Sequence, residues 1–591
     1  MNTTTILNAI DRGSAARILS ELKAPAPFAR NTAAVDAAEA RARAALAEPI
    51  PPLPWSKFRL FRDTGNRSEY ERPFFARRSR LADLEISILA GRDADGALLL
   101  ALEDLIWATC DECAWALPAH IYNLVGNMGS TRPMEIDIDL FASETGLYLA
   151  EVLHLLGDKL DSRVVTRCRN EIKRRILDSY LADYPAYWWE SGRNNWGAVC
   201  AGSVGITFLY EETNPARRRA ALARVLATMD AFLNSFPPDG TCEEGVGYWE
   251  YGFGFFALFA DFVYQYTNGE ADLFDDPRAR RIALFPQSVA LSPTRTVSFS
   301  DGGRCSSGFS AARLILQRHY GNVVSLAKVG ENLLSPAPKS ANRLRALLMA
   351  DPARPDDPLP DGTTFLPDAQ WLVVRHAPFA FAALFGNNGV SHNHNDVGTF
   401  LMVDGDEEGP MDLGSGEYTR QYFSSERYTI FCNGAQGHSV PIVGGSFQKA
   451  GSQYRASDVS MAEADGEIVF SGDIAGAYGL DTLSSLRRTF RVRPASGAAT
   501  VTDEFAFSGA PLSVTERFVG YAKAEIAAPG EVRFGAFKAT FDPELKVSVH
   551  TEPMSTHAKS MVTAYVLDIE VPAGTVKFEI SFRNRAQCPG S

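Results

Sequence analysis

The spacing of apolar residues changes once along this 591-residue chain, and the change separates two kinds of structure. From about residue 30 to about residue 345, apolar residues recur at steps of three and four, which is typical of amphipathic α-helices. Many such helices joined by short turns favour paired hairpins, which pack naturally into a toroid or solenoid. The predicted helices span residues 33–46, 98–116, 135–156, 163–184, 195–210, 215–235, 248–266 and 310–320.

A proline-rich segment ends the helical part. Five prolines and several acidic residues lie between residues 349 and 368, which is the composition of a linker. Beyond it the apolar pattern has period two, and ten short segments without intervening helices favour an antiparallel β-sandwich. These segments span residues 371–375, 379–385, 399–403, 467–470, 487–492, 499–507, 514–519, 547–550, 562–569 and 576–582. We therefore expect a toroid domain over residues 1–350, a linker over 351–368 and a β-sandwich domain over 369–591.

The composition and net charge of the chain exclude some classes of binding partner. The formal net charge of −13 argues against indiscriminate binding to nucleic acid, which needs a basic surface. The first 23 residues have no apolar core of a secretory signal, and no apolar stretch reaches the length of a membrane span. The eight cysteines, scattered along the chain, fit reduced thiols. The sequence therefore predicts a cytoplasmic protein without a membrane or nucleic-acid partner.

Histidines and acidic residues gather near the start of the strand-rich part. His392 and His394 stand two apart in a segment that alternates like a β-strand, so both side chains would point to one face. Asp412 and His438 follow in glycine-rich turns that short hairpins could bring back to the same place. Imidazoles with a carboxylate suit Zn²⁺ or a similar divalent ion. Ordinary hydrogen-bonded histidines would explain an isolated pair, but the additional residues favour a functional cluster.

Two adjacent asparagines lead into one of the predicted helices, just after a pair of tryptophans. An asparagine at a helix start can cap free backbone N–H groups, which explains one of Asn194 and Asn195. The other amide could bind a protonated substrate carboxylate, and indole rings suit the apolar faces of sugars. This segment is therefore a candidate carbohydrate site.

A second polar segment precedes the helix predicted at 248–266. Glycines flank Tyr248 and keep the approach to its hydroxyl open, although many such tyrosines are ordinary core residues. Asp239, Glu243 and Glu244 in the same segment could instead supply the two carboxylates of a glycoside hydrolase. Sequence spacing does not separate these two interpretations.

In their order along the chain, these motifs resemble the heparinase II/III-like polysaccharide lyases. The resemblance extends from about residue 180 to about residue 450. The matching motifs are Asn194-Asn195-Trp196, Asp239-Gly240 with Glu244-Gly245 and Tyr248, Phe299-Ser300-Asp301-Gly302, His392-Asn393-His394-Asn395-Asp396, Asp412-Leu413-Gly414-Ser415-Gly416-Glu417-Tyr418, and Gly437-His438-Ser439. The resemblance implies an (α/α) toroid followed by an antiparallel β-sandwich. It also implies a lyase that cleaves uronic-acid-containing poly- or oligosaccharides, of glycosaminoglycan or alginate type, by β-elimination.

The resemblance assigns catalytic roles to three residues. Asn195 would neutralise the uronate carboxylate, Tyr248 would act as base and then as acid, and His392 would assist at the same carbon. Because an unperturbed tyrosine has a pKa near 10, Tyr248 would need positive charge close by. Further contacts with substrate would come from Asn194, Trp196, Glu244, Tyr251 and Tyr418. Tyr251 would also replace Tyr248 if the match along the aromatic run is shifted by one helical turn.

The resemblance also assigns a divalent ion to the histidine cluster. His394, Asp412 and His438 would be the ligands, with Zn²⁺ first and Mn²⁺ or Ca²⁺ as alternatives. Asp396 would orient one of the histidines without contacting the ion itself. A homodimer is one candidate assembly.

Two further questions of interpretation remain open from the sequence. In a metal-dependent cupin-like protein or a non-catalytic sugar-binding sandwich, the histidine cluster would suffice and Asn195 and Tyr248 would have no role. The arginines of residues 72–80, interleaved with Phe74 and Phe75, could line a groove for an anionic glycan or could be a solvated helix face.

Overall fold

The computed structural model describes most of the chain and divides it into two compact units. The described residues are 2–121, 132–191, 194–304, 311–323, 334–335, 340–354 and 357–584. The helical unit comprises Met1–Phe236, Trp249–Ala283 and Ser307–Asp357. The strand unit comprises Pro237–Tyr248, Leu284–Ser306 and Pro358–Ser591. Two segments from the helical part of the sequence therefore belong to the strand unit.

The division expected from the sequence differs from these units for two physical reasons. Long-range contacts fix the early segments: the Ser298 hydroxyl donates to the Asp412 carbonyl at 2.8 Å, and the ring of Phe299 packs edge-on against Trp371 at 5.1 Å. Local composition does not reveal such contacts. In addition, residues 362–366, inside the expected linker, form a strand that pairs with the next one.

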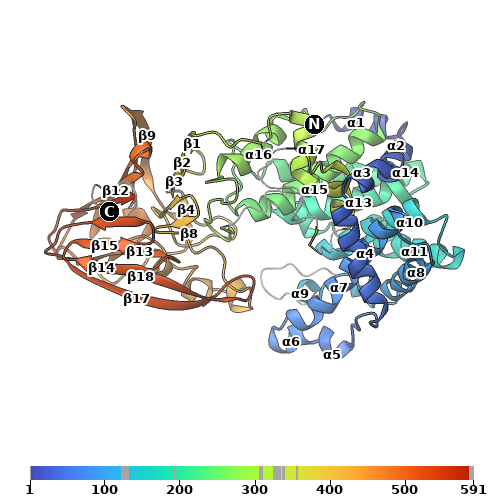
Figure 1. Ribbon diagram of the computed structural model, residues 1–591, viewed down its shortest axis with the longest axis horizontal. Coiled ribbons are helices and arrows are strands. Elements are labelled where there is room, and N and C mark those ends of the chain that lie inside the picture. The colour runs from blue at the N-terminus through green and yellow to red at the C-terminus, as the bar shows by residue number, and fades with distance from the viewer. Residues whose placement is uncertain are drawn as a thin grey trace. The chain divides into compact units, whose positions relative to one another are not determined.

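Helices lie in each range that the apolar periodicity predicts, and there are additional helices before residue 90 and at 118–121, 277–288 and 340–349. Their bounds are α1 Thr3–Ile10, α2 Ala16–Leu22, α3 Pro25–Arg30, α4 Thr32–Leu46, α5 Trp55–Phe58, α6 Leu60–Thr64, α7 Ser68–Leu89, α8 Ala97–Cys110, α9 Pro118–Ile121, α10 Leu140–Leu156, α11 Ser162–Ile172, α12 Ser179–Leu181, α13 Asn195–Glu211, α14 Pro215–Leu233, α15 Val246–Tyr266, α16 Pro277–Ser288, α17 Ala311–Tyr320 and α19 Ser340–Met349. Figure 1 labels most of them. Among the described residues, no helix combines the length and apolar character needed to cross a bilayer.

Helix α13 is buried along nearly its whole length and is packed closely by its neighbours. It contacts α10 and α14, and only three residues separate α13 from α14, so these two form a hairpin. Two glycines allow α15 to approach. A Cβ on Gly202 would lie 3.1 Å from the Phe255 carbonyl, and one on Gly205 would lie 2.6 Å from the Phe259 ring.

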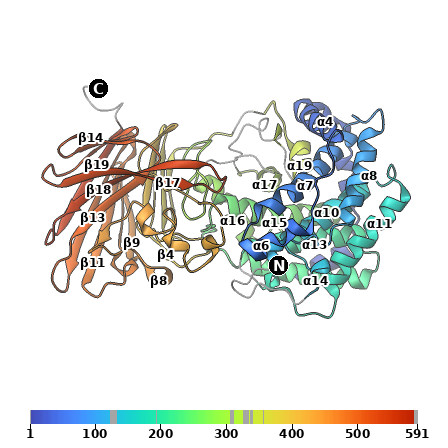
Figure 2. The ribbon, with the colours of Figure 1, turned by 90° about the horizontal axis from the view of Figure 1, so that it is seen from below.

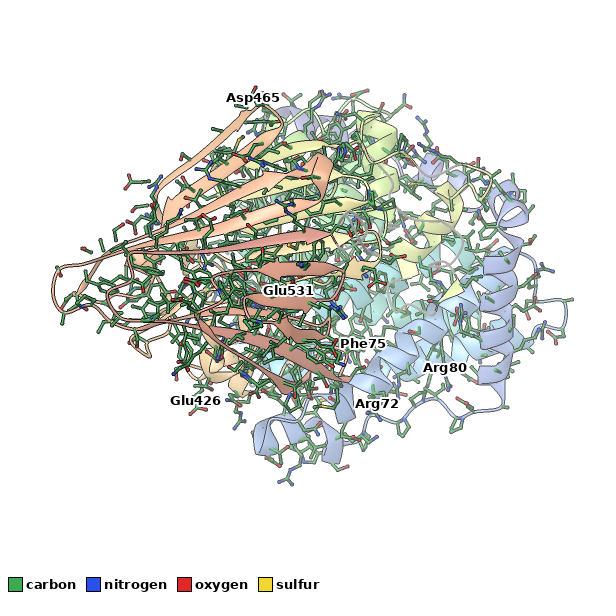
Figure 3. All side chains as sticks on the ribbon, turned by 60° about the vertical axis from the view of Figure 1, so that its left-hand side comes forward. Arg72, Phe75, Arg80, Glu426, Asp465 and Glu531 are labelled. Atoms are coloured by element: carbon green, nitrogen blue, oxygen red, sulfur yellow. The ribbon has the colours of Figure 1, made fainter. Side chains whose placement is uncertain are left out.

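The arginines of residues 72–80 are mainly structural. They lie on α7, where Figure 3 labels Arg72, Phe75 and Arg80. Arg77 and Arg78 are buried, and both donate to Glu112, at 2.9 and 2.7 Å. These two arginines therefore stabilise the helical unit and do not line a groove.

In the strand unit, every strand pair among the described residues is antiparallel. Its strands are β1 Gly362–Leu366, β2 Trp371–His376, β3 Phe379–Leu384, β4 Asn387–Asn388, β5 Phe400–Asp404, β6 Glu407–Glu408, β7 Ile442–Val443, β8 Gly451–Arg455, β9 Ser457–Ala464, β10 Glu467–Asp473, β11 Leu483–Arg493, β12 Ala498–Phe507, β13 Val514–Gly520, β14 Ala524–Ala528, β15 Glu531–Phe534, β16 Phe537–Thr540, β17 Lys546–Ser555, β18 Met561–Val571 and β19 Lys577–Asn584. The sheet orders are β14-β15-β16-β19-β12-β11-β10-β9, β1-β2-β3-β5-β6, β17-β18-β13-β7 and β4-β8. Figure 2 shows the long strands β17 and β18 side by side.

The three larger sheets share one aromatic core. Phe381 on β3 packs against Phe490 on β11 with ring centroids 5.6 Å apart, and Phe400 on β5 packs against Phe518 on β13 at 6.1 Å. Outside this core the chain turns back toward solvent: Asp465, labelled in Figure 3, lies in the tight turn between β9 and β10. The alternation read from the sequence thus builds a sandwich with one apolar interior.

A fully buried arginine crosses this interior. Arg488 on β11 donates to Asp503 on β12 at 2.9 Å and to Glu516 on β13 at 3.2 Å, and the side chains of all three are inaccessible. Its Nη1 also donates to the carbonyls of Gly398 and Ser439, at 2.9 and 2.7 Å. Arg488 therefore connects two sheets with the two loops that follow Asp396 and His438.

Replacing Arg488 with alanine should destabilise the protein strongly. The substitution leaves Asp503 and Glu516 buried without their cation, and removing one partner of a buried ion pair costs about 3–5 kcal/mol. Urea titration followed by circular dichroism would measure the change. Arg491→Ala, on the same strand with a side chain 51% exposed, is the matched control and should change stability by less than about 0.5 kcal/mol. Equal losses in the two variants would contradict the assigned role.

Candidate functional site

The histidine pair lies in a loop between β4 and β5 and not in a strand. His392 has φ of +55°, in the left-handed region, so the alternation expected from the sequence is broken at this residue. The strand prediction for this segment is wrong. Both imidazoles nevertheless reach one carboxylate: His392 Nδ1 lies 2.7 Å from Asp301 Oδ2, and His394 Nε2 lies 3.1 Å from Asp301 Oδ1.

Asp301 is the centre of the site. Besides the two imidazoles, it accepts hydrogen bonds from the Tyr418 hydroxyl at 3.0 Å, from Arg427 Nη2 at 2.9 Å and from the Tyr422 hydroxyl. Its side chain is inaccessible to solvent. Although burial alone would raise it, the hydrogen bonds from the two imidazoles and the charge of Arg427 hold the pKa of Asp301 well below its usual range. The site is therefore organised around a buried, ionised carboxylate.

Glycines allow three motif segments to meet at Asp301. A Cβ on Gly245 would lie 3.0 Å from the Gly302 Cα, and one on Gly414 would lie 2.5 Å from the Gly302 carbonyl. Gly245 and Gly414 also have positive φ, +98° and +63°. A side chain at either position would be both strained and crowded. Close packing of the chain segments therefore explains why these motif positions are glycines.

Tyr248 lies in the first turn of α15, and its hydroxyl faces this cluster. The hydroxyl lies 2.6 Å from the Tyr418 hydroxyl and 3.4 Å from His392 Nδ1, and the rings of Tyr248 and His392 are 4.4 Å apart. Burial and then the charge of Asp301 raise the pKa of Tyr248 well above its usual range, despite the opposing charge of Arg427. Arg427 is thus the arginine that acts on Tyr248, but the expected net lowering of its pKa does not occur. The resting phenol holds its proton.

The residues predicted in the helical unit have different local roles. Asn194 caps α13 by accepting from the Trp196 backbone N–H at 3.1 Å, which accounts for one amide of the pair. Asn195 is 9% exposed in the first turn of α13, and a Cβ on Gly252 would lie 3.0 Å from its Cβ. The ring of Trp196 packs against Trp188 at 4.9 Å.

Tyr251 does not behave as a substitute for Tyr248. Its hydroxyl donates to Glu144 Oε1 at 2.6 Å within the helical unit. Burial and the Glu144 carboxylate raise its pKa well above the usual range. The phenol is therefore engaged in a structural hydrogen bond.

One of the proposed hydrolase carboxylates, Asp239, has a structural role. Asp239 accepts from the Thr241 N–H and hydroxyl through one oxygen, and from the backbone N–H groups of Asp368 and Ala369 through the other. It therefore joins two turns. Glu244, predicted to bind substrate, has a buried oxygen without a hydrogen-bond partner among the described residues, and burial raises its pKa.

A second cluster lies on the far side of His394 from Asp301. His394, Asp396, Asp412 and His438 are all buried, and one ligand atom of each lies within 4.8 Å of the others. The second ring nitrogens are occupied elsewhere: His394 Nε2 contacts Asp301, and His438 Nε2 lies 3.0 Å from the Cys432 carbonyl. Among the described residues, His394 Nδ1 and Asp396 Oδ2 have no hydrogen-bond partner, and His438 Nδ1 lies 3.1 Å from Asp412 Oδ2.

This donor set fits a divalent cation. Two buried imidazole nitrogens and two buried carboxylate oxygens face one another, and buried polar atoms ordinarily have partners. Burial raises the pKa of Asp396 to about 7 and lowers that of His394, whereas the Asp412 carboxylate, against the effect of burial, raises the pKa of His438. Asp396, predicted to orient one of the histidines, also offers a carboxylate oxygen of its own to this cluster.

Comparison with known proteins identifies the fold. No protein-family model matches the sequence, and no curated protein is similar to it in sequence. Among solved structures, a heparinase III has 13% sequence identity and a TM-score of 0.61, over 93% of this chain and 84% of that one. A heparan sulfate lyase from Pedobacter heparinus has 12% identity and a TM-score of 0.57, over 98% and 92%. A chondroitin AC lyase from Streptomyces coelicolor A3, solved with chondroitin sulphate, has 13% identity and a TM-score of 0.54, over 98% and 83%.

The chain has the heparinase-like polysaccharide lyase fold. The predicted fold class, a helical toroid followed by an antiparallel sandwich, is thereby confirmed. The cupin-like alternative would not include the toroid that this fold contains.

Sequence reasoning missed the connecting residues of the site. Asp301 was part of a matching motif but had no predicted role, and Tyr422 and Arg427 carried no signal at all. The one clue in the sequence was the position of Asp301 in the matching motif Phe299-Ser300-Asp301-Gly302.

The partly buried Glu243 should make stability depend on pH. Burial, with smaller effects of Asp239 and Glu244, raises its pKa from 4.5 to about 7. Since the folded state favours the protonated acid, the wild-type protein should lose stability relative to Glu243→Gln as pH rises from 4.5 to about 7, by on the order of 1–3 kcal/mol. Urea unfolding at pH 5 and pH 8 would measure it, with Glu579→Gln on β19 as control. A pH-independent difference would refute the burial effect.

Proposed function

We propose that this protein cleaves uronic-acid-containing poly- or oligosaccharides by β-elimination. The observation that carries the proposal is the hydrogen-bonded group of Tyr248, Tyr418 and His392 on Asp301, in a chain with a polysaccharide lyase fold. In the reaction, a base takes the proton from C5 of the uronate, the electrons form a C4–C5 double bond, and the C4–O bond breaks as O4 receives a proton. One fragment keeps a hydroxyl, and the other ends in an unsaturated uronate.

The two candidate acid–base groups suit different halves of this reaction. Tyr248 holds its proton at rest, because burial and Asp301 raise its pKa, so it is suited to protonate O4 as the bond breaks. The side chain of His392 is 22% exposed, and its Nδ1 is hydrogen-bonded to Asp301. Its Nε2 is therefore the nitrogen that can accept a proton. Positioned groups of this kind contribute roughly 10²–10⁴-fold to a rate. The role of Tyr248 as base as well as acid remains a prediction from the family resemblance.

Asn195 is the proposed partner of the uronate carboxylate. The C5 proton is a very weak acid, so the carboxylate must be stabilised as it gains enolate character. A hydrogen bond directed at such charge is worth about 3–4 kcal/mol. The family resemblance supports this role for Asn195. The buried position of its amide, beside the closely packed Gly252, is consistent with the role.

We further propose that His394, Asp396, Asp412 and His438 hold a divalent ion, Zn²⁺ first, with Mn²⁺ and Ca²⁺ as alternatives. The ion would supply the positive charge that neutralises two buried carboxylates. Support comes from the four facing donor atoms within 4.8 Å of one another. A cytoplasmic location and a homodimer remain predictions from the sequence.

Activity can be tested on a panel of uronate polymers and oligomers, including glycosaminoglycans and alginate. We expect products with the ultraviolet absorbance of the new alkene, and we expect Tyr248→Phe to lower kcat by at least about 10²-fold because O4 loses its proton donor. Tyr251→Phe, on the same helix but bonded to Glu144, is the matched control and should retain most activity. Reducing ends formed without an alkene would indicate the hydrolase alternative instead.

Removal of metal should lower thermal stability. A ligand present at 100 times its Kd stabilises the folded state by about 2.7 kcal/mol. We therefore expect dialysis against a chelator to lower Tm and Zn²⁺ to restore it, while His438→Ala shows no response to Zn²⁺. His376→Ala, at a side chain 49% exposed outside the cluster, is the control and should respond as wild type. An unchanged Tm in wild type after chelation would argue against a bound ion.

A further inference from the structure

We propose that Phe423 is a substrate-binding residue, whose exposed ring receives the apolar face of the sugar next to the reacting uronate. The inference rests on the proposed lyase function and adds to it a residue that the family resemblance does not include. Phe423 ends the short 3₁₀-helix Gln421–Phe423, in the same segment of the strand unit that supplies Tyr418.

Phe423 is an exposed apolar side chain beside polar groups that are proposed to act in turnover. Its side chain is 37% exposed. Single exposed apolar side chains are common on soluble proteins and need no explanation by themselves. Among those in the described part of the chain, however, Phe423 is the one whose ring contacts His392 and Tyr418, with ring centroids 6.3 and 5.0 Å apart. An apolar surface is therefore open to solvent next to His392.

The backbone that carries this ring is held on both sides. Tyr422, the preceding residue, is buried and its hydroxyl donates to Asp301, and Arg427 donates to the same carboxylate at 2.9 Å. The backbone N–H of Phe423 donates to the Arg420 carbonyl at 3.3 Å. The Tyr422 ring is thus buried, while the Phe423 ring is exposed. A ring on a held segment loses little conformational entropy when a ligand covers it, which favours binding.

The neighbouring rings have contacts of their own that do not involve Phe423. Tyr418 packs against Tyr422 at 4.7 Å and against His557 at 4.3 Å, and its hydroxyl lies 2.6 Å from that of Tyr248. These contacts hold Tyr418 in place. Support of the neighbouring rings therefore does not account for an exposed phenylalanine at position 423.

The chemistry of the ring indicates which part of the substrate it binds. Phenylalanine has no polar atom and offers only an apolar face, which suits the C–H face of a sugar ring. The ring is nearly perpendicular to that of His392, at 87°, with the two centroids 6.3 Å apart. Reacting atoms approach to about 3–3.5 Å. A sugar stacked on Phe423 therefore lies beside the uronate whose C5 meets His392, so its ligand is the neighbouring sugar of the same chain.

The kinetic test compares KM and kcat for alkene formation on a uronate oligomer. Phe423→Ala should raise KM by roughly tenfold and change kcat by less than about threefold, because the neighbouring sugar loses a contact made equally in the ground state and the transition state. Phe447→Ala, at a side chain 42% exposed between β7 and β8, is the matched control and should behave as wild type. An unchanged KM in Phe423→Ala, or a loss confined to kcat, would overturn the inference.

Two conservative substitutions separate stacking from packing. Phe423→Tyr keeps the aromatic face and should leave KM within about twofold of the wild-type value. Phe423→Leu keeps a large apolar side chain without that face and should raise KM about as much as Phe423→Ala does, with Tm unchanged. A wild-type KM in Phe423→Leu would indicate a packing role and would overturn the inference.

A binding measurement keeps this inference separate from the proposed function. Isothermal titration of the slow variant Tyr248→Phe with glycosaminoglycan and alginate tetrasaccharides should give a Kd that the added Phe423→Ala raises by roughly tenfold. Such weakening in a protein that forms no alkene would refute the lyase function and retain the contact with Phe423. Equal Kd values with and without the ring would overturn the inference even in an active lyase, and absence of binding to every tetrasaccharide would overturn both.

Discussion

A single buried carboxylate holds the site of this protein together. Asp301 accepts from two imidazoles, two phenols and one guanidinium, and all five donors lie 91 to 126 positions after it in the sequence. Burying a charge is tolerated only when donors surround it, so the ionised form of Asp301 and the positions of its partners depend on one another. The same charge raises the pKa of Tyr248, which keeps its proton until the reaction needs it.

Two features of the fold hold this arrangement in place: close contacts between backbone segments and the buried guanidinium of Arg488. Gly245, Gly302 and Gly414 let three chain segments approach to distances that a side chain would block. Arg488 holds the loops that follow Asp396 and His438 against the sandwich core. Scaffold and site are therefore continuous, and substitutions deep in the sandwich are expected to disturb the histidine cluster.

Periodic patterns predicted many of the helices and strands. Helices such as α14 and strands such as β11 and β18 were visible because a buried face repeats along them. Helix α7 was not among the predicted helices, and the two alternatives for its arginines, a glycan groove and a solvated helix face, both fail for Arg77 and Arg78, which are buried and donate to Glu112. The strand expected through His392 was wrong because one residue of positive φ ends the alternation.

The sequence by itself determined the order of helices and strands, the histidine and tyrosine motifs, and the resemblance to polysaccharide lyases. Local periodicity and residue type are enough for those conclusions. Only the tertiary structure decided that Asp239 is structural, that Asp396 joins the candidate metal ligands, and that Asp301 connects them to His392. The physical reason is that a hydrogen bond or a ligand set depends on distances between atoms. For residues separated by nearly a hundred positions, the fold sets these distances and the local sequence does not.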